Sequence, residues 1–231
     1  MFNSMPSELI EVMQLTIVFS VLFGTILFLL FTADKPNTKN LYMKKIFDYW
    51  IPDCDEHFER LIKKRIRNGG PAEYQDDVRS AAYKHVKDFS VAIDVGANIG
   101  FWTKPLSVKF KKIFAFEPVQ NVFDCLKKNT ENLNIVYHQF VVSDRESYVD
   151  MIVDTVNTGN NIVDTNSFDT GKIYVNKLDN MNLPKFGLIK VDCQGHDYFV
   201  LAGAKETLQK YKDAPFRAPM IIILVSELSL I

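Results

Sequence analysis

The chain has 231 residues, enough for one α/β domain with a sizeable core and an additional segment. Its 27 basic and 28 acidic side chains leave a net charge of −1, which argues against the strongly basic face expected of a nucleic-acid-binding protein. The 3 cysteines show no C-x-x-C spacing, so the sequence predicts a reducing compartment and no zinc site.

The first predicted element is a membrane span from Val12 to Thr32. This stretch carries no formal charge and, as a helix, is long enough to cross a bilayer core of ~30 Å; a buried core helix is the alternative. Residues 1–32 contain no Lys or Arg, so the basic region of a signal peptide is missing. Lys35, Lys39 and Lys44 follow the span, and the positive-inside rule predicts a single-pass membrane protein whose globular part faces the cytoplasm.

Residues 33–89 are predicted to form a linker and N-terminal helices. The aromatic and basic residues of 41–51 are typical either of a membrane interface or of a segment packed on the domain, and the sequence leaves both interpretations open. Apolar residues at helical spacing predict helices over 53–68 and 75–87.

The stretch Val91 to Gly100, VAIDVGANIG, is predicted to be a buried parallel strand that opens into a glycine turn and a helix over 101–110. Gly96 and Gly100 suit a tight turn or the close approach of a ligand. A dinucleotide-binding turn needs G-x-G-x-x-G, but Asn98 stands at the middle glycine. Asp94 would repel a pyrophosphate and attract a cation. The pattern therefore favours S-adenosylmethionine, which carries an ammonium and a sulfonium, over NAD.

A second predicted strand, Lys111 to Phe116, ends at Glu117. Glu117 follows Gly96 by 21 residues, close to the separation of about 20 at which an acidic residue reaches a ribose diol in such folds. A carboxylate has two acceptor oxygens and can accept from both ribose hydroxyls. The alternative is an ordinary solvated loop carboxylate.

The next predicted elements are a helix over 121–132 and a third strand over 134–142. Asp144 follows that strand, where it would accept a hydrogen bond from an adenine amino group or serve as a turn residue. Two segments of alternating polarity, 148–155 and 172–178, predict an antiparallel pair. The polar segment 157–171 between them is predicted to be a loop that covers a substrate or is simply mobile.

A fourth predicted strand, Gly187 to Asp192, brings three titratable residues to the same edge of the sheet. Asp192, His196 and Asp197 stand where a methyl acceptor would meet the sulfonium. An imidazole has an ordinary pKa near 6.5 and suits a general base, so His196 is predicted to take the acceptor's proton, with a helix-start residue as the alternative. A helix over 198–208 and a fifth strand over 220–227 complete the predicted elements.

Taken together, these motifs resemble the FkbM family of S-adenosylmethionine-dependent methyltransferases. The resemblance runs from Ser90 to Glu227, within a predicted methyltransferase domain of 90–231. It rests on an ordered set: IDVGANIG, AFEP, VVSD and the block LDNMNLPKFGLIKVDCQGHDYFVLAGA. It implies a Rossmann-like class I methyltransferase sheet of order 3-2-1-4-5, and methyl transfer to oxygen of a sugar, a glycolipid or another small molecule.

The resemblance also implies roles for single residues. The glycine-turn residues would border the methionine part of the cofactor, and the residues after the later strands would meet the ribose, the adenine and the transferred methyl group. In that order they are Asp94, Gly96, Asn98 and Gly100, then Glu117, Asp144 and Asp192.

Two departures from the family pattern bear on function. Gln194 stands where the family usually has Glu, and Asp197 replaces a later Glu; the lost carboxylate argues against metal-assisted chemistry. The chain also stops at Ile231 without the hairpin that ordinarily follows the fifth strand, so we expect an irregular sheet edge or a protein partner there.

The leading hypothesis is therefore a membrane-tethered O-methyltransferase acting on a saccharide or lipid-linked acceptor. The alternative is a catalytically silent S-adenosylmethionine-binding module. Methylation of adenine amino groups is disfavoured because DCQG stands where such enzymes have [DNS]-P-P-[YFW].

Overall fold

The computed structural model describes residues 42–72, 74–212 and 221–224, and the predicted span over 12–32 lies outside these ranges. Within the described ranges, no helix has the length and apolar character needed to cross a membrane. All described residues belong to the unit that begins at Tyr42.

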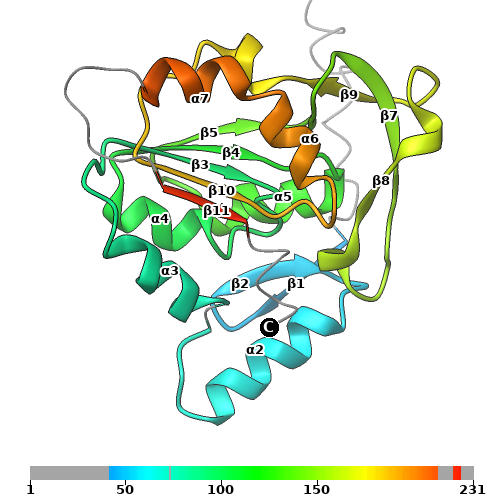
Figure 1. Ribbon diagram of the computed structural model, residues 1–231. Coiled ribbons are helices and arrows are strands. Elements are labelled where there is room, and N and C mark those ends of the chain that lie inside the picture. Colours follow the sequence, from blue (N-terminus) through cyan, green and yellow to red (C-terminus); the bar gives the residue numbers. More distant parts are fainter. Residues whose placement is uncertain (1–41, 73, 213–220, 225–231) are drawn as a thin grey trace, which may run out of the picture. The chain divides into compact units, whose positions relative to one another are not determined.

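A five-stranded parallel sheet organises the described residues (Figure 1). Its order is β11-β10-β3-β4-β5, which confirms the predicted order 3-2-1-4-5. The strands are β3 (Val91–Val95), β4 (Lys112–Phe116), β5 (Ile135–His138), β10 (Leu188–Val191) and β11 (Ile221–Leu224). Because every residue of β3 and β10 is buried, these strands form the apolar centre that a doubly wound sheet requires.

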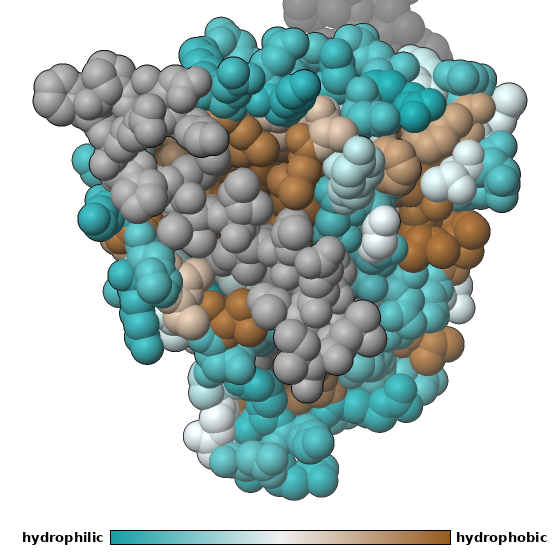
Figure 2. Space-filling model, in the orientation of Figure 1, coloured by the Kyte–Doolittle hydropathy of each residue, from teal (hydrophilic) through white to brown (hydrophobic). Residues whose placement is uncertain are grey.

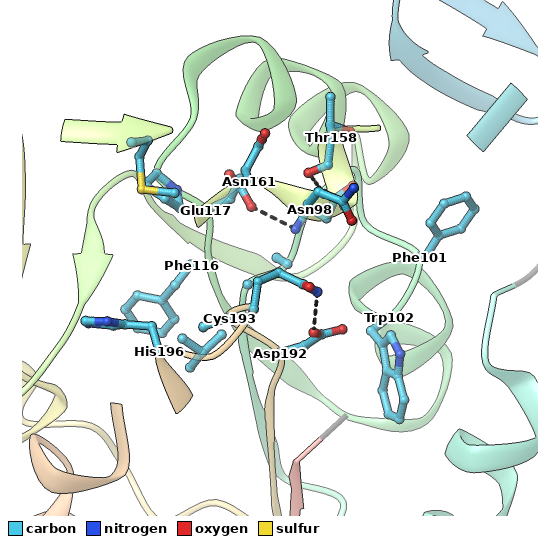
Figure 3. A pocket seen from close by; sticks show the side chains of 18 of the residues that line it. Asn98, Phe101, Trp102, Phe116, Glu117, Thr158, Asn161, Asp192, Cys193 and His196 are labelled. Carbon is cyan, nitrogen blue, oxygen red and sulfur yellow. Dashed lines mark hydrogen bonds between the residues drawn. The ribbon is translucent and has the colours of Figure 1, made fainter. Parts of the chain in front are cut away.

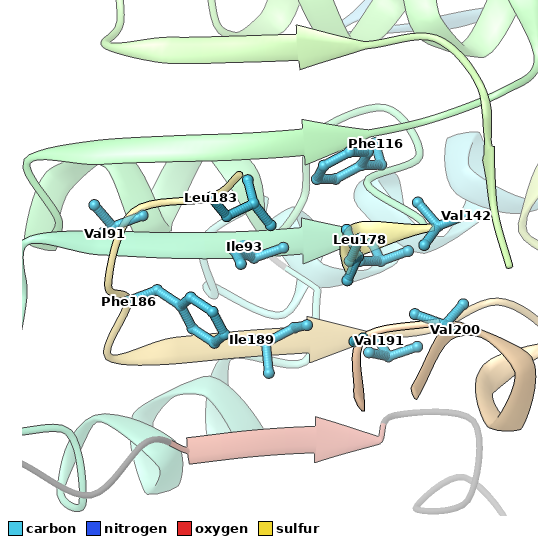
Figure 4. Close-up of a cluster of buried hydrophobic side chains, with 12 residues drawn as sticks. Val91, Ile93, Phe116, Val142, Leu178, Leu183, Phe186, Ile189, Val191 and Val200 are labelled. Atoms are coloured by element: carbon cyan, nitrogen blue, oxygen red, sulfur yellow. The ribbon is translucent and has the colours of Figure 1, made fainter. Parts of the chain in front are cut away.

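Helices cover both faces of this sheet (Figure 1). On one face, Ile93 and Ile189 pack with Val200 and the loop residue Phe186 (Figure 4); the helices are α6 (Asp197–Ala202) and α7 (Lys205–Lys212). On the other face, Ala92 packs with α3 (Asp76–Tyr83) and α4 (Thr103–Lys109), and Ala115 packs with α5 (Gln120–Asn129).

A second sheet of four strands, in the order β6-β9-β7-β8, lies beside the carboxyl ends of the central sheet (Figure 1). It comprises β6 (Val141–Val142), β7 (Ser147–Ile152), β8 (Ile162–Asp164) and β9 (Ile173–Asn176). The predicted antiparallel pair is confirmed, since β7 pairs with β9 in that sense. The single predicted strand over 134–142 is wrong, because the chain leaves β5 and enters the second sheet as β6.

Two other predictions differ from the structure. The helix over 198–208 is two helices, α6 and α7. Between them the Gly203 carbonyl accepts from the Asp179 N–H at 2.9 Å, and a side chain at Gly203 would meet the Ser143 carbonyl oxygen at 1.9 Å. The segment 157–171 is not wholly a loop: it contains β8 and the 3₁₀ turns η1 (Thr158–Asn160) and η2 (Thr165–Ser167). A third 3₁₀ turn, η3 (Leu178–Met181), follows β9.

Residues 43–67, called here the N-terminal segment, pack on the domain through a hairpin and a helix. The hairpin consists of β1 (Met43–Ile46) and β2 (Tyr49–Pro52), and the helix is α2 (His57–Arg67). The side-chain amide of Asn129, in α5, pairs with the backbone of β2. It accepts from the Trp50 N–H at 2.6 Å and donates to the Trp50 carbonyl at 2.8 Å. Phe58 and Ile62 of α2 are buried, and its opposite face forms the hydrophilic surface at the bottom of Figure 2. Of the aromatic residues left open by the sequence, Tyr49 is buried, whereas Tyr42 and Phe47 are exposed.

Candidate cofactor-binding site

A cavity of about 310 Å³ lies where β3, β4 and β10 end (Figure 3). Each of these strands, the second sheet and the N-terminal segment contributes to its wall. Among the lining residues are Gly96, Asn98, Trp102, Glu117, Val142, Thr158, Asn161, Asp192 and His196. Open α/β sheets bind their ligands at this edge, and the volume lies in the range of small-molecule sites.

The glycine turn brings the ends of three strands together. Gly96 has φ +71°, and a side chain there would meet the Asp192 carbonyl oxygen at 2.0 Å, so only glycine allows β3 and β10 to end this close to each other. The N–H groups of Gly96 and Ala97 both donate to the Phe116 carbonyl at the end of β4, at 3.0 and 2.9 Å. Asn98 also has a positive φ, of 50°, and lines the cavity.

Glu117 lies in the cavity wall, as the sequence predicts, and its side chain is held by backbone donors. One oxygen accepts from the Asn98 N–H and the other from the Val119 N–H, each at 3.0 Å. Each oxygen has a further lone pair, so the carboxylate can also accept hydrogen bonds from a diol. Burial raises the pKa of Glu117 from its ordinary 4.5 to about 7.

We expect ligand binding at Glu117 to depend on pH. A diol that donates to the carboxylate stabilises the charged form, whereas burial disfavours it. Affinity for S-adenosylhomocysteine, measured by calorimetry, should therefore rise by up to about tenfold per pH unit below pH 7 and level off above it. Glu117→Gln, which cannot ionise, should remove this dependence; an unchanged pH profile in that variant would contradict the assignment.

Asp94 lies beneath the cavity instead of facing it. It is fully buried, accepts from the Thr103 hydroxyl at 2.6 Å and forms an ion pair with Lys190 at 3.1 Å. Lys190 also donates to the Gly96 carbonyl at 2.6 Å. Burial lowers the pKa of Lys190, but the charges of Asp94 and Asp192 outweigh it, so that its pKa is raised and the side chain stays charged. The negative charge expected to attract the cofactor is thus neutralised within the protein.

Gly100 and Asp144 also differ from their predicted positions in the site. Gly100 faces α5, where a side chain would meet Leu126 and Thr130 at 3.1 and 3.3 Å. Asp144 is paired with Arg145 at 2.9 Å, and this pairing holds the pKa of Asp144 below its usual value. Neither residue lines the cavity.

Asp192 and His196 both line the cavity. His196 is 5% exposed; its ring stacks on Phe199, and its Nε2 lies 3.0 Å from the Ser143 hydroxyl. Burial lowers the pKa of His196, so the ring is neutral near pH 7, as a proton acceptor must be. Burial raises the pKa of Asp192, and the Gln194 amide donates to its carboxylate at 3.0 Å.

Asp197, the third predicted catalytic residue, holds the loop that follows β10. Its two oxygens accept from the backbone N–H groups of Cys193 and Gly195, each at 3.1 Å. Asp197 does not line the cavity, so the structure gives it a positioning role. It stabilises the conformation in which Asp192 and His196 face the cavity.

A clamp that the sequence pattern does not predict joins the segment 55–58 to the cavity wall. Asp55 is fully buried and accepts from the N–H and hydroxyl of Thr158, at 2.8 and 2.6 Å, and from the Phe58 N–H at 2.7 Å. The Thr158 carbonyl then accepts from the Asn98 side chain at 3.1 Å. Hydrogen bonds therefore run from Asp55 through Thr158 and Asn98 to Glu117. The sequence signal is an Asp just before an amphipathic helix, but the partner of Asp55 lies 103 residues away along the chain.

The parallel sheet, the glycine turn and the acidic residue after β4 define a Rossmann-like methyltransferase domain. The family model for the methyltransferase FkbM domain matches residues 94–223, more than half of the chain. The chain therefore belongs to the FkbM methyltransferase family, whose cofactor is S-adenosylmethionine. No curated protein gives a significant match.

Two solved structures are among those that the chain matches. The FkbM methyltransferase from Methylobacillus flagellatus KT is 18% identical, with a TM-score of 0.37, over 53% of this chain and 31% of that one. The precorrin-6y C5,15-methyltransferase from Geobacter metallireducens GS-15 is 11% identical, with a TM-score of 0.36, over 58% and 60%. The present chain thus spans less than two thirds of either protein.

Proposed function

We propose that this chain methylates a hydroxyl group of a saccharide, a glycolipid or another small molecule, at the cytoplasmic face of the membrane to which residues 12–32 anchor it. The observation that carries the proposal is that a neutral, buried imidazole, His196, lines the same cavity as Glu117. The cofactor, when bound, supplies an electrophilic methyl group. The chain's own residues then have to hold the acceptor and take its proton.

The geometry supports separate roles for Glu117 and His196 in the cavity wall. Glu117 accepts hydrogen bonds from the ribose, and His196 accepts the proton that the attacking hydroxyl loses. Ser143, 3.0 Å from His196 Nε2, orients the imidazole. Asp192, whose pKa burial raises, holds the acceptor by a hydrogen bond.

A methyl-transfer assay tests this proposal. The purified chain is incubated with methyl-labelled S-adenosylmethionine and a panel of saccharides and membrane glycolipids, and labelled product is measured. We expect transfer to a hydroxyl acceptor, and we expect His196→Gln to lower kcat by about 10²–10⁴-fold, the range for loss of a general base, without changing the affinity for S-adenosylhomocysteine. The exposed His85 provides a matched control, and His85→Gln should leave kcat unchanged.

A second candidate function is cofactor binding without catalysis. The hydrogen bond from Gln194 to Asp192 favours this alternative, because the Gln194 amide occupies one oxygen of the carboxylate that would otherwise hold the acceptor. Tight cofactor binding with no transfer to any acceptor in the panel would support this alternative and contradict the first.

A further inference from the structure

The side-chain amide of Asn161 lies in the cavity wall, where its oxygen accepts a hydrogen bond and its nitrogen has no partner among the described residues. Asn161 follows η1 and lines the cavity. Its Oδ1 accepts from the Asp154 N–H at 3.0 Å. Its Nδ2 is buried and has no hydrogen-bond partner among the described residues.

The orientation of this amide follows from its surroundings. A flipped amide would place its NH₂ group against the Asp154 N–H, donor against donor, so only the observed orientation satisfies that backbone group. The Asp154 carboxylate also holds the segment 154–160 in place. It accepts from the N–H groups of Val156 and Asn157, at 2.8 and 2.9 Å, and from the Asn160 side chain at 3.1 Å. The Nδ2 donor is therefore held in one place before any ligand binds.

An unpaired buried donor of this kind requires an acceptor. Leaving a buried N–H group unsatisfied destabilises the folded protein, and native proteins rarely contain such groups. Since Asn161 lines the cavity, a bound molecule is the natural source of the missing acceptor.

The position of Asn161 indicates which part of the cofactor supplies that acceptor. Thr158, three residues before Asn161, is hydrogen-bonded to Asn98, whose backbone N–H contacts Glu117. Figure 3 draws Asn161 at the Glu117 end of the cavity, whereas His196 and Trp102 lie elsewhere in the wall.

We propose that Asn161 donates a hydrogen bond to the nucleoside half of S-adenosylmethionine, beside the ribose that Glu117 binds. This inference rests on the cofactor occupying the cavity of Figure 3. It gives the segment between β7 and β8 a direct part in cofactor recognition, with an oxygen or ring nitrogen of the nucleoside as the acceptor.

Calorimetric titration of S-adenosylhomocysteine into the purified chain and its variants tests the inference. We expect Asn161→Ala to weaken binding by about 3- to 10-fold, the equivalent of one neutral hydrogen bond. Asn161→Asp keeps the oxygen that accepts from Asp154 but has no donor, so it should weaken binding at least as much. Asn166 is exposed in η2, and Asn166→Ala should bind like the wild type.

Each alternative gives a different result. If Asn161 only anchors its loop, Asn161→Asp binds like the wild type, and the inference is overturned. Adenosine alone should lose the same factor as S-adenosylhomocysteine; if adenosine binding is unchanged, the contact lies outside the nucleoside and the inference is also overturned. Absence of any binding by the folded wild-type chain would instead refute the cofactor site itself. Urea midpoints close to the wild-type value establish that the variants are folded.

Discussion

Replacing Lys190 by methionine should lower the free energy of unfolding by about 3–5 kcal/mol, the range for removing one partner of a buried ion pair. Lys190 and Asp94 are 2% and 0% exposed, and they are direct neighbours on the paired strands β10 and β3. Without the ammonium group, the Thr103 hydroxyl is the one hydrogen-bond donor that the Asp94 carboxylate keeps among the described residues. A buried charge without a counterion then opposes folding.

Urea denaturation of the purified chain measures this effect. The double variant Asp94→Asn/Lys190→Met removes both charges and should recover part of the stability. Lys87→Met, at an exposed position, should change it by less than about 0.5 kcal/mol. Equal losses for Lys87→Met and Lys190→Met would show that the pair has no structural role.

Replacing Asp55 by alanine should destabilise the chain by about 3 kcal/mol or more and also weaken cofactor binding. The substitution leaves three buried donors without an acceptor, the Phe58 N–H and the N–H and hydroxyl of Thr158, at about 1–3 kcal/mol for each donor that stays buried and unpaired. It also frees Thr158, whose carbonyl holds the Asn98 side chain. The stability of the fold and the geometry of the cofactor-binding site therefore both depend on the Asp55 carboxylate.

The two effects are measured by urea denaturation and by titration with S-adenosylhomocysteine. Asp53→Ala is the matched control, because Asp53 is exposed two residues before Asp55. A variant Asp55→Ala that loses stability but keeps wild-type affinity would show that the clamp does not reach the binding site.

The sequence predicts the part of the fold that depends on local pattern. Short apolar strands, the glycine turn and Glu117 follow directly from residue type and spacing, and the sheet order follows from the family resemblance. Lys190 was not predicted, although a lysine within the apolar run GLIKV is a signal. Recognising Asp94 as its partner requires the register between β10 and β3, which spacing along the chain does not provide.

Long-range contacts account for the remaining differences at the site. Asp197 carries the charge of a catalytic residue, but its two oxygens are occupied by backbone N–H groups of the preceding loop. The segment 157–161 enters the cavity wall because Asp55, 103 residues before Thr158, binds it. Neither arrangement has a periodic signature, since each depends on where the folded chain places backbone donors.

The most direct test of the central claim is calorimetric titration of S-adenosylmethionine and S-adenosylhomocysteine into the wild-type chain, beside Glu117→Ala. The cavity at the ends of β3, β4 and β10 predicts micromolar binding at one site, and loss of a charge-assisted hydrogen bond predicts a reduction of about 1.5–3 kcal/mol in the variant. Absence of binding by a chain that circular dichroism shows to be folded, or equal binding by Glu117→Ala, would contradict the account.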